Sequence, residues 1–127
     1  MPVNSFASQY EEIANQWQKC RDAYSGQDAL IANGADYVPS LDGQSSAEYT
    51  SYIRRGLYFN ATAKTVHGMM GSCFRRSPTI VAGSSEPLMD DVTLTDLSFE
   101  GLAKEAMREI LITGRYGLLC DYSDEEG

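Results

Sequence analysis

The sequence has few of the features that commonly cross-link or anchor a small protein. Its three cysteines, at positions 20, 73 and 120, are odd in number and widely spaced. That pattern argues against a disulfide framework and predicts buried thiols in a reducing compartment. No apolar run approaches the roughly 18 residues of a membrane span, and the N-terminus does not have the pattern of a secretory signal. With 127 residues, the chain is long enough for one domain with its own core.

Residue patterns that carry catalysis or bind metals are also scarce. The sequence contains no phosphate-binding loop, no Gly-x-Gly-x-x-Gly and no nucleophile elbow. The single histidine, His67, and Cys73 are six residues apart, so on a helix their side chains would diverge by about 120° and not share a metal. Asp90 and Asp91 could supply a Mg²⁺ ligand pair, but a loop rim is favoured because no third ligand is nearby. We therefore expect no enzymatic activity, no cofactor and no metal.

Charge is unevenly distributed along the chain. The net charge is −8, and acidic residues gather in "EPLMDD" and in the C-terminal "DYSDEEG". Basic residues fall in the middle, at Arg54, Arg55, Lys64, Arg75 and Arg76. The overall acidity disfavours tight binding of nucleic acid. The arginine pairs are candidates for contact with acidic surfaces of neighbouring copies or with DNA phosphate, and the alternative is that they are solvated surface residues.

Hydrophobic periodicity predicts a mainly helical fold. An apolar stripe that includes Trp17 predicts a helix over about residues 5–25, and a capping box at Ser45 and Glu48 begins another over about 46–55. Gly56 should kink or end that helix. A third helix over about 57–74 follows, and Pro78 prevents it from extending further. A fourth helix, over about 99–113, has Ser98 as its N-cap and Gly114 as its C-cap.

Two short strands complete the predicted secondary structure. Residues 79–82 form a weak candidate, and a strand over about 117–122 follows the last helix. A single terminal strand needs ladder partners. The expected class is therefore mainly α, or α+β, in which residues 1–127 form one segment and the sheet is completed elsewhere.

The helix expected over 57–74 carries two different faces. Phe59, Val66 and Met70 lie on an apolar stripe, whereas Gly68 and Gly71 lie on the opposite side, where a surface helix would normally carry larger polar residues. Small residues allow another backbone to approach closely. We therefore expect this helix to be covered on both sides, although two glycines could also simply bend or fray a surface helix.

The order and spacing of several short motifs give the chain a family resemblance. A helix with Trp17 is followed by a loop with Tyr37, Pro39 and Leu41 and then by Gly43-Gln44. Asn60-Ala61-Thr62 and Gly68 precede an exit formed by Gly71, Phe74, Arg75 and Pro78. The last element has Leu111, Gly114, Arg115, Gly117 and Asp121. Across residues 17–122 this pattern resembles the N-terminal part of tailed-bacteriophage portal proteins, with departures at His67 and Cys120.

The resemblance implies a structural role in a virion. Portal proteins form a ring, usually of twelve copies, at one capsid vertex, and DNA enters and leaves through its channel. The implied partners are the same chain, the major capsid protein, terminase, a head–tail adaptor and double-stranded DNA that passes without sequence-specific binding. The implied location is the virion, with assembly in the host cytoplasm. This sequence would supply the wing-like segment, and the stem and clip would lie beyond residue 127.

A second interpretation does not require a ring. A small acidic phage protein could bind and inhibit a host factor, because a strongly acidic surface can mimic nucleic acid. The two hypotheses differ in the expected mass of the particle, since a ring is a high-order oligomer and an inhibitor is a monomer or dimer.

Overall fold

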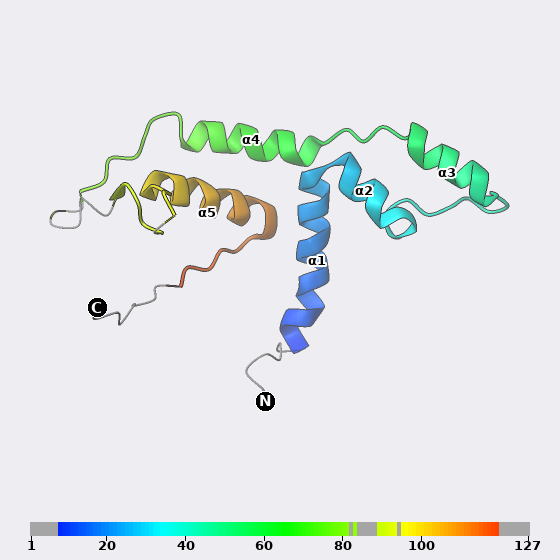
Figure 1. The fold of residues 1–127 in the computed structure, drawn as a ribbon, viewed down its shortest axis with the longest axis horizontal. Helices are drawn as coiled ribbons and strands as arrows, with labels where there is room; N and C mark the ends of the chain where they lie inside the picture. Colours follow the sequence, from blue (N-terminus) through cyan, green and yellow to red (C-terminus); the bar gives the residue numbers. More distant parts are fainter. Residues whose placement is uncertain (1–7, 82, 84–88, 94, 120–127) are drawn as a thin grey trace. The chain divides into compact units, whose positions relative to one another are not determined.

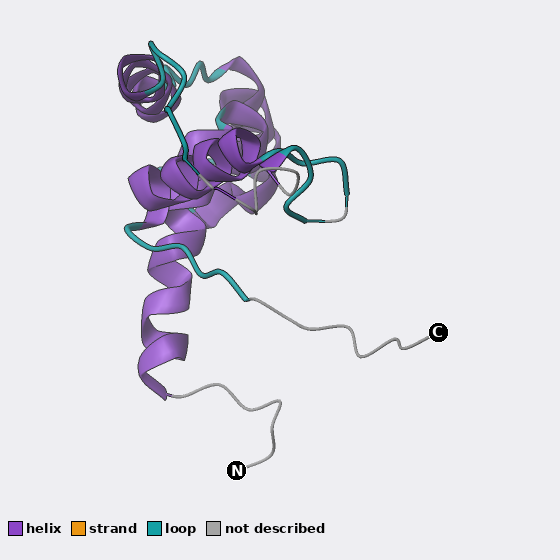
Figure 2. Cartoon of the chain, turned by 90° about the vertical axis from the view of Figure 1, so that its left-hand side faces the viewer, coloured by secondary structure: helices purple, strands orange, loops and turns teal. Residues whose placement is uncertain are grey.

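A computed structural model describes residues 8–81, 83, 89–93 and 95–119. The chain divides into two compact units, residues 1–77 and residues 78–127. The first contains α1 (Ser8–Ser25), α2 (Gln27–Asn33), a 3-10 turn η1 (Gly34–Asp36), α3 (Ser46–Arg55) and α4 (Ala61–Cys73). The second contains α5 (Phe99–Thr113). The fold is mainly α, and no strand occurs in the described ranges (Figures 1 and 2).

The first unit is organised around the C-terminal end of α1. Both α2 and α4 contact α1, and in Figure 1 both begin beside its C-terminal end. The side-chain amide of Asn60 connects α1 to α4 through its oxygen and its nitrogen. Its Oδ1 accepts a hydrogen bond from the Ala63 amide at 2.7 Å, which caps α4, while its Nδ2 donates to the Tyr24 carbonyl in the last turn of α1 at 2.7 Å. One amide thus satisfies groups at two helix ends that would otherwise be unpaired.

Gly26 makes room for this contact. It is buried, and its φ of 100° lies in the region that only glycine adopts readily. A Cβ at this position would lie 2.9 Å from Asn60 Nδ2. The chain can therefore turn directly from α1 into α2 while Asn60 lies against the turn.

Tyrosines add further hydrogen bonds between α1 and the later segments. Tyr58 donates its hydroxyl to the Ala23 carbonyl at 3.2 Å, and its backbone amide donates to Gln27 Oε1 at 3.3 Å. Tyr24 meets His67 of α4, with 3.0 Å between the hydroxyl oxygen and Nε2 and an edge-on ring contact at 5.7 Å. These bonds hold the start of α4 and the segment before it against α1.

Asp22 connects α1 to the segment after α2. Its side chain is buried, with 8% exposed, and accepts hydrogen bonds from Gln18 at 2.9 Å, Asn33 at 3.3 Å and the Tyr37 hydroxyl at 2.7 Å. A buried carboxylate needs such donors, because each replaces water that burial has removed. The bond to Asp22, together with desolvation and the charges of Asp22 and Asp36, raises the pKa of Tyr37 to about 12.

The loop and the start of α3 follow the local rules expected from the sequence. Gln44 closes the Asp42-Gly43 turn with two hydrogen bonds to Leu41. Its backbone N–H donates to the Leu41 carbonyl, and its side-chain Oε1 accepts from the Leu41 backbone N–H. The capping box of Ser45 and Glu48 is present, and hydrogen bonds from Ser45 lower the pKa of Glu48. Tyr49 of α3 donates to the Val38 carbonyl at 2.8 Å, which fastens the helix to the loop.

The second unit is a turn followed by a capped helix. Asp91 accepts a hydrogen bond from the Thr95 amide at 3.1 Å, and the Val92 amide donates to the Leu97 carbonyl. Asp91 thus stabilises a turn. Ser98 caps α5 as expected, and Gly114 ends it in the left-handed conformation.

Three of the secondary-structure predictions differ from the structure: the start of one helix and two short strands. The helix expected over 57–74 begins only at Ala61, because Leu57–Phe59 are extended and Asn60 serves as the N-cap. The strands expected over 79–82 and 117–122 are absent at residues 79–81 and 117–119, and their remaining residues lie outside the described ranges. In the described part of the chain these segments have no ladder partner, and propensity alone does not form a strand. Residues 5–7 of the first expected helix also lie outside the description.

Replacing Asn60 tests the connection between α1 and α4. Asn60→Ala removes both hydrogen bonds, and the lost cap alone should destabilise the fold by about 1 kcal/mol. Asn60→Asp keeps the oxygen that caps α4 but loses the N–H that donates to the Tyr24 carbonyl. Comparing the two variants therefore separates the stability contributed by the cap from that contributed by the bond to α1. Thermal unfolding followed by circular dichroism measures both. Equal stability of the wild type and both variants would show that Asn60 does not connect the helices.

Tyr37 predicts a loss of stability at high pH. Its folded-state pKa of about 12 lies above the usual 10.0, so its contribution is complete below about pH 10 and is lost as pH rises toward 12. An absorbance titration should show one of the eight tyrosines ionising late. That late step should disappear in Tyr37→Phe and move to lower pH in Asp22→Asn, whereas Tyr52→Phe should retain it.

Candidate docking surface

The described part of the first unit has almost no apolar core. Val66 is its one buried apolar side chain, with 4% exposed. Large apolar side chains are instead open to solvent, foremost Leu57 at 94%, Phe59 at 75% and Leu41 at 66%. Scattered exposed apolar residues are ordinary, but a contiguous group of them marks an interaction surface.

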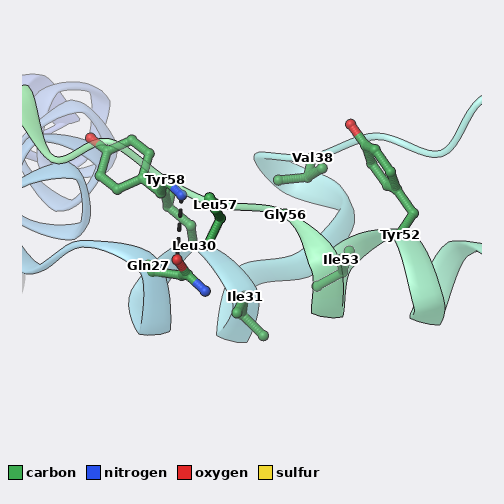
Figure 3. A pocket seen from close by; sticks show the side chains of 9 residues that line it. All are labelled: Gln27, Leu30, Ile31, Val38, Tyr52, Ile53, Gly56, Leu57 and Tyr58. Atoms are coloured by element: carbon green, nitrogen blue, oxygen red, sulfur yellow. Dashed lines mark hydrogen bonds between the residues drawn. The ribbon is translucent and has the colours of Figure 1, made fainter.

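Several of these residues surround an apolar groove of about 220 Å³ in the first unit (Figure 3). Leu30 and Ile31 of α2 line it on one side, and Tyr52 and Ile53 of α3 on another. Val38, Gly56, Leu57, Tyr58 and Gln27 complete it. On one side of the groove, the hydrogen bond from the Tyr58 backbone N–H to Gln27 Oε1 holds the segment that precedes α4 against α2. The groove can accept an apolar side chain from another molecule.

The segment between α3 and α4 presents alternating side chains. Leu57 and Phe59 are exposed, whereas Tyr58 between them turns inward to the Ala23 carbonyl. In extended backbone, successive side chains point to opposite sides. The hydrogen bonds of Tyr58 thus leave Leu57 and Phe59 exposed. Leu57 lines the groove, and Lys64 Nζ lies 5.8 Å from the centre of the Phe59 ring.

A wider polar hollow adjoins the apolar groove through Tyr52, which lines both. Asp42, Glu48 and Arg55 contribute its charges. Glu48 is engaged by Ser45, and Arg55 donates from Nε to the Ser51 carbonyl at 3.2 Å. The apolar groove is therefore bordered on the Tyr52 side by a hollow lined with charged and polar residues.

Gly68 and Gly71 lie on an open face of α4. Both are exposed, and a Cβ at either position would meet nothing within 4 Å. Within the described part of the first unit, nothing covers this face. The cover that the sequence predicted for the glycine side of this helix is therefore absent from its own unit, and without a cover from elsewhere the two glycines only loosen a solvent-exposed helix.

The four arginines named from the sequence are exposed but do not form one cluster. Arg54 and Arg55 end α3, and Arg75 and Arg76 follow α4. Between the pairs lies the whole of α4, whose 13 residues span about 20 Å. One pair therefore ends α3 and the other follows α4, and sequence proximity to the same helix does not bring the two pairs together.

The residues that carry the family resemblance have identifiable local roles. Trp17 packs edge-on against Tyr10 at 5.3 Å, Gly43 and Gln44 form the turn before α3, and Asn60 caps α4. Ala61 and Thr62 form the first turn of that helix, and Phe74 ends it. In the second unit, Pro78 precedes the turn and Gly114 ends α5, while the Arg115 carbonyl accepts from Thr113 and Gly117 is exposed. Most of these roles are structural and concern helix ends.

Sequence reasoning missed the residues that connect the helices. Asp22, Gln27 and Tyr58 were not singled out, and Gly26 was expected only to end the first helix, although each takes part in the connections at the end of α1. Only Asn60 had a readable signal, since asparagine is a preferred N-cap. The long-range partners have no signature in a single sequence.

The cysteines do not behave as predicted. Cys20 and Cys73 are free and exposed, so the expectation that they are buried is wrong, because the described helices enclose too little volume to bury them. Cys120 lies outside the described residues. Within the described ranges, no group of three or more His, Cys, Asp or Glu side chains could hold a metal, and no helix is long and apolar enough to cross a membrane.

Comparisons with protein-family models, with curated proteins and with solved structures each found no match. The geometry of the exposed surface and the sequence resemblance are therefore the basis for any functional proposal.

Paired substitutions test whether the exposed apolar residues serve the isolated chain. Leu57→Ser should leave the free energy of unfolding nearly unchanged, because the side chain is already 94% exposed. Val66→Ala should lower it by about 1–2 kcal/mol, since it removes buried methyl groups. Urea denaturation of both variants gives the comparison. A large loss from Leu57→Ser would mean that Leu57 is covered within a single copy.

Proposed function

We propose that this protein is a structural subunit of a multi-copy assembly, specifically the wing-like part of a tailed-phage portal ring. The observation that supports it most is the combination of fixed helix ends with uncovered apolar sides. Leu57, which lines an apolar groove, and Phe59 are exposed, while Val66 is the one buried apolar side chain in the described part. A contiguous exposed apolar surface of this kind is typical of a site that other protein covers.

The family resemblance narrows the assembly to a portal. Its residues, from Trp17 through Gly43-Gln44 and Asn60 to Gly114, lie mostly at turns and helix ends. A subunit packed between neighbours must present its surfaces at defined angles, which is what such positions control. In this role the protein catalyses no reaction and needs no cofactor. Its partners would be further copies, the capsid, terminase and an adaptor, with DNA passing through the channel.

Electron microscopy tests the proposal directly. Antibodies raised against the purified chain should label a single vertex of the phage particle, and averaged images of that vertex should show a ring around a channel. Native mass spectrometry of the isolated complex gives the copy number. A chain that stays a monomer or dimer and labels no particle would contradict the proposal and favour the small acidic inhibitor.

A further inference from the structure

The net charge of the chain belongs entirely to its second unit. Residues 1–77 contain seven Lys or Arg and seven Asp or Glu, whereas residues 78–127 contain three and eleven. The first unit is therefore neutral, and the second carries the whole net charge of −8. Opposite or unequal charge on two units of one chain favours contact between unlike units of different copies over contact between like units.

Within the first unit, the positive charge is concentrated around α4. From Tyr49 to Ser77 there is no acidic residue, and five basic residues lie there. On α4, Lys64, Gly68 and Gly71 fall within one turn-spaced stripe, opposite the buried Val66, and all three are exposed. Exposed Arg75 follows the helix. We call Leu57, Phe59, Lys64, Gly68, Gly71 and Arg75 the α4 face.

The α4 face combines apolar anchors with positive charge. Phe59, 75% exposed, lies beside Lys64, and Leu57, 94% exposed, comes two residues earlier in the chain and lines the neighbouring groove. Arg75 follows the other end of the helix. The open glycines between Lys64 and Arg75 present backbone that another chain can approach closely. An occupant suited to this face has exposed apolar side chains followed by carboxylates.

The second unit carries such a sequence. Leu118 and Leu119 follow α5 and are 66% and 92% exposed. Four carboxylates come next in the sequence, at Asp121, Asp124, Glu125 and Glu126. The two leucines supply the apolar part, and the carboxylates supply the charge that Lys64 and Arg75 would meet.

We infer that the α4 face of one copy docks the segment that begins at Leu118 of a second copy. The contact joins different surfaces on its two partners, so repeating it generates a closed ring or an open filament. This inference rests on the proposed function, because it names the surfaces through which such an assembly would form. Nucleic acid is the less favoured occupant, since a chain of net charge −8 repels phosphate overall.

Sedimentation velocity of the full chain over a range of concentrations tests the contact. The wild type should self-associate, and the association should weaken in about 1 M salt, where the Debye length is about 3 Å. Lys64→Glu should weaken association by about tenfold. The matched control is Lys19→Glu, which makes the same charge change on α1, outside the α4 face, and should change association less than twofold.

A charge exchange between copies identifies the docked segment. Glu125→Lys alone should weaken association as Lys64→Glu does, and an equimolar mixture of the two variants should recover most of it. A wild type that stays monomeric at every concentration would overturn the inference. So would equal effects of Lys64→Glu and Lys19→Glu, a mixture that does not recover, or preferential binding of a DNA duplex to the α4 face.

The two proposals can fail separately. If antibodies label one capsid vertex and a ring is present, but Lys64→Glu and Glu125→Lys leave the ring intact, the portal role stands and the docking contact is wrong. If the contact is found by charge exchange but no particle is labelled, the contact stands and the portal role is wrong.

Discussion

The side chain of Asn60 fixes the orientation of the start of α4 relative to the end of α1. One amide group caps α4 through its oxygen and binds the last turn of α1 through its nitrogen. Both bonds are directional, so they specify an angle as well as a contact. Gly26 is required beside it, because any larger residue would collide with the amide nitrogen. Tyr58 then binds the same end of α1, and this contact determines that Leu57 and Phe59 face outward. The exposed apolar surface is thus a consequence of how the helix ends are connected.

Polar connections of this kind define geometry better than they supply stability. A typical intramolecular hydrogen bond contributes about 1 kcal/mol net, because it replaces bonds to water, whereas each buried aliphatic side chain contributes about 1.5–3 kcal/mol. The first unit has many of the former and, in its described part, one buried apolar side chain, Val66. Asp22 is an example: burying its carboxylate costs free energy, and the three hydrogen bonds that it accepts largely offset this cost. Covering Leu57, Phe59 and the groove would add hydrophobic stabilisation.

The helix ends could be predicted from the sequence because their signals are local. Ser45 with Glu48, Ser98 and Gly114 act within three or four residues of themselves, and each has the predicted role. The start of α4 was predicted four residues too early, since Leu57–Phe59 continue the apolar periodicity and only Tyr58, held by α1, shows that the segment is extended. The strand at residues 117–119 failed for a related reason: strands depend on partners distant in sequence. Of the candidate site, solvated arginines were one of two alternatives drawn from the sequence, whereas the cover expected over Gly68 and Gly71 is absent from the first unit and the groove was not foreseen.

The arrangement of charge and apolar surface fits the proposed assembly subunit better than a small inhibitor. A protein that mimics nucleic acid needs a continuous acidic surface on a body that is stable alone. Here the stretch from Tyr49 to Ser77 lacks acidic residues altogether, and it includes the most exposed apolar side chains of the first unit. The negative charge lies in the other unit. Two unlike surfaces on one chain are redundant in a lone binder, but in the proposed repeating structure each would have an occupant in the next copy. The division of charge therefore favours assembly independently of the family resemblance.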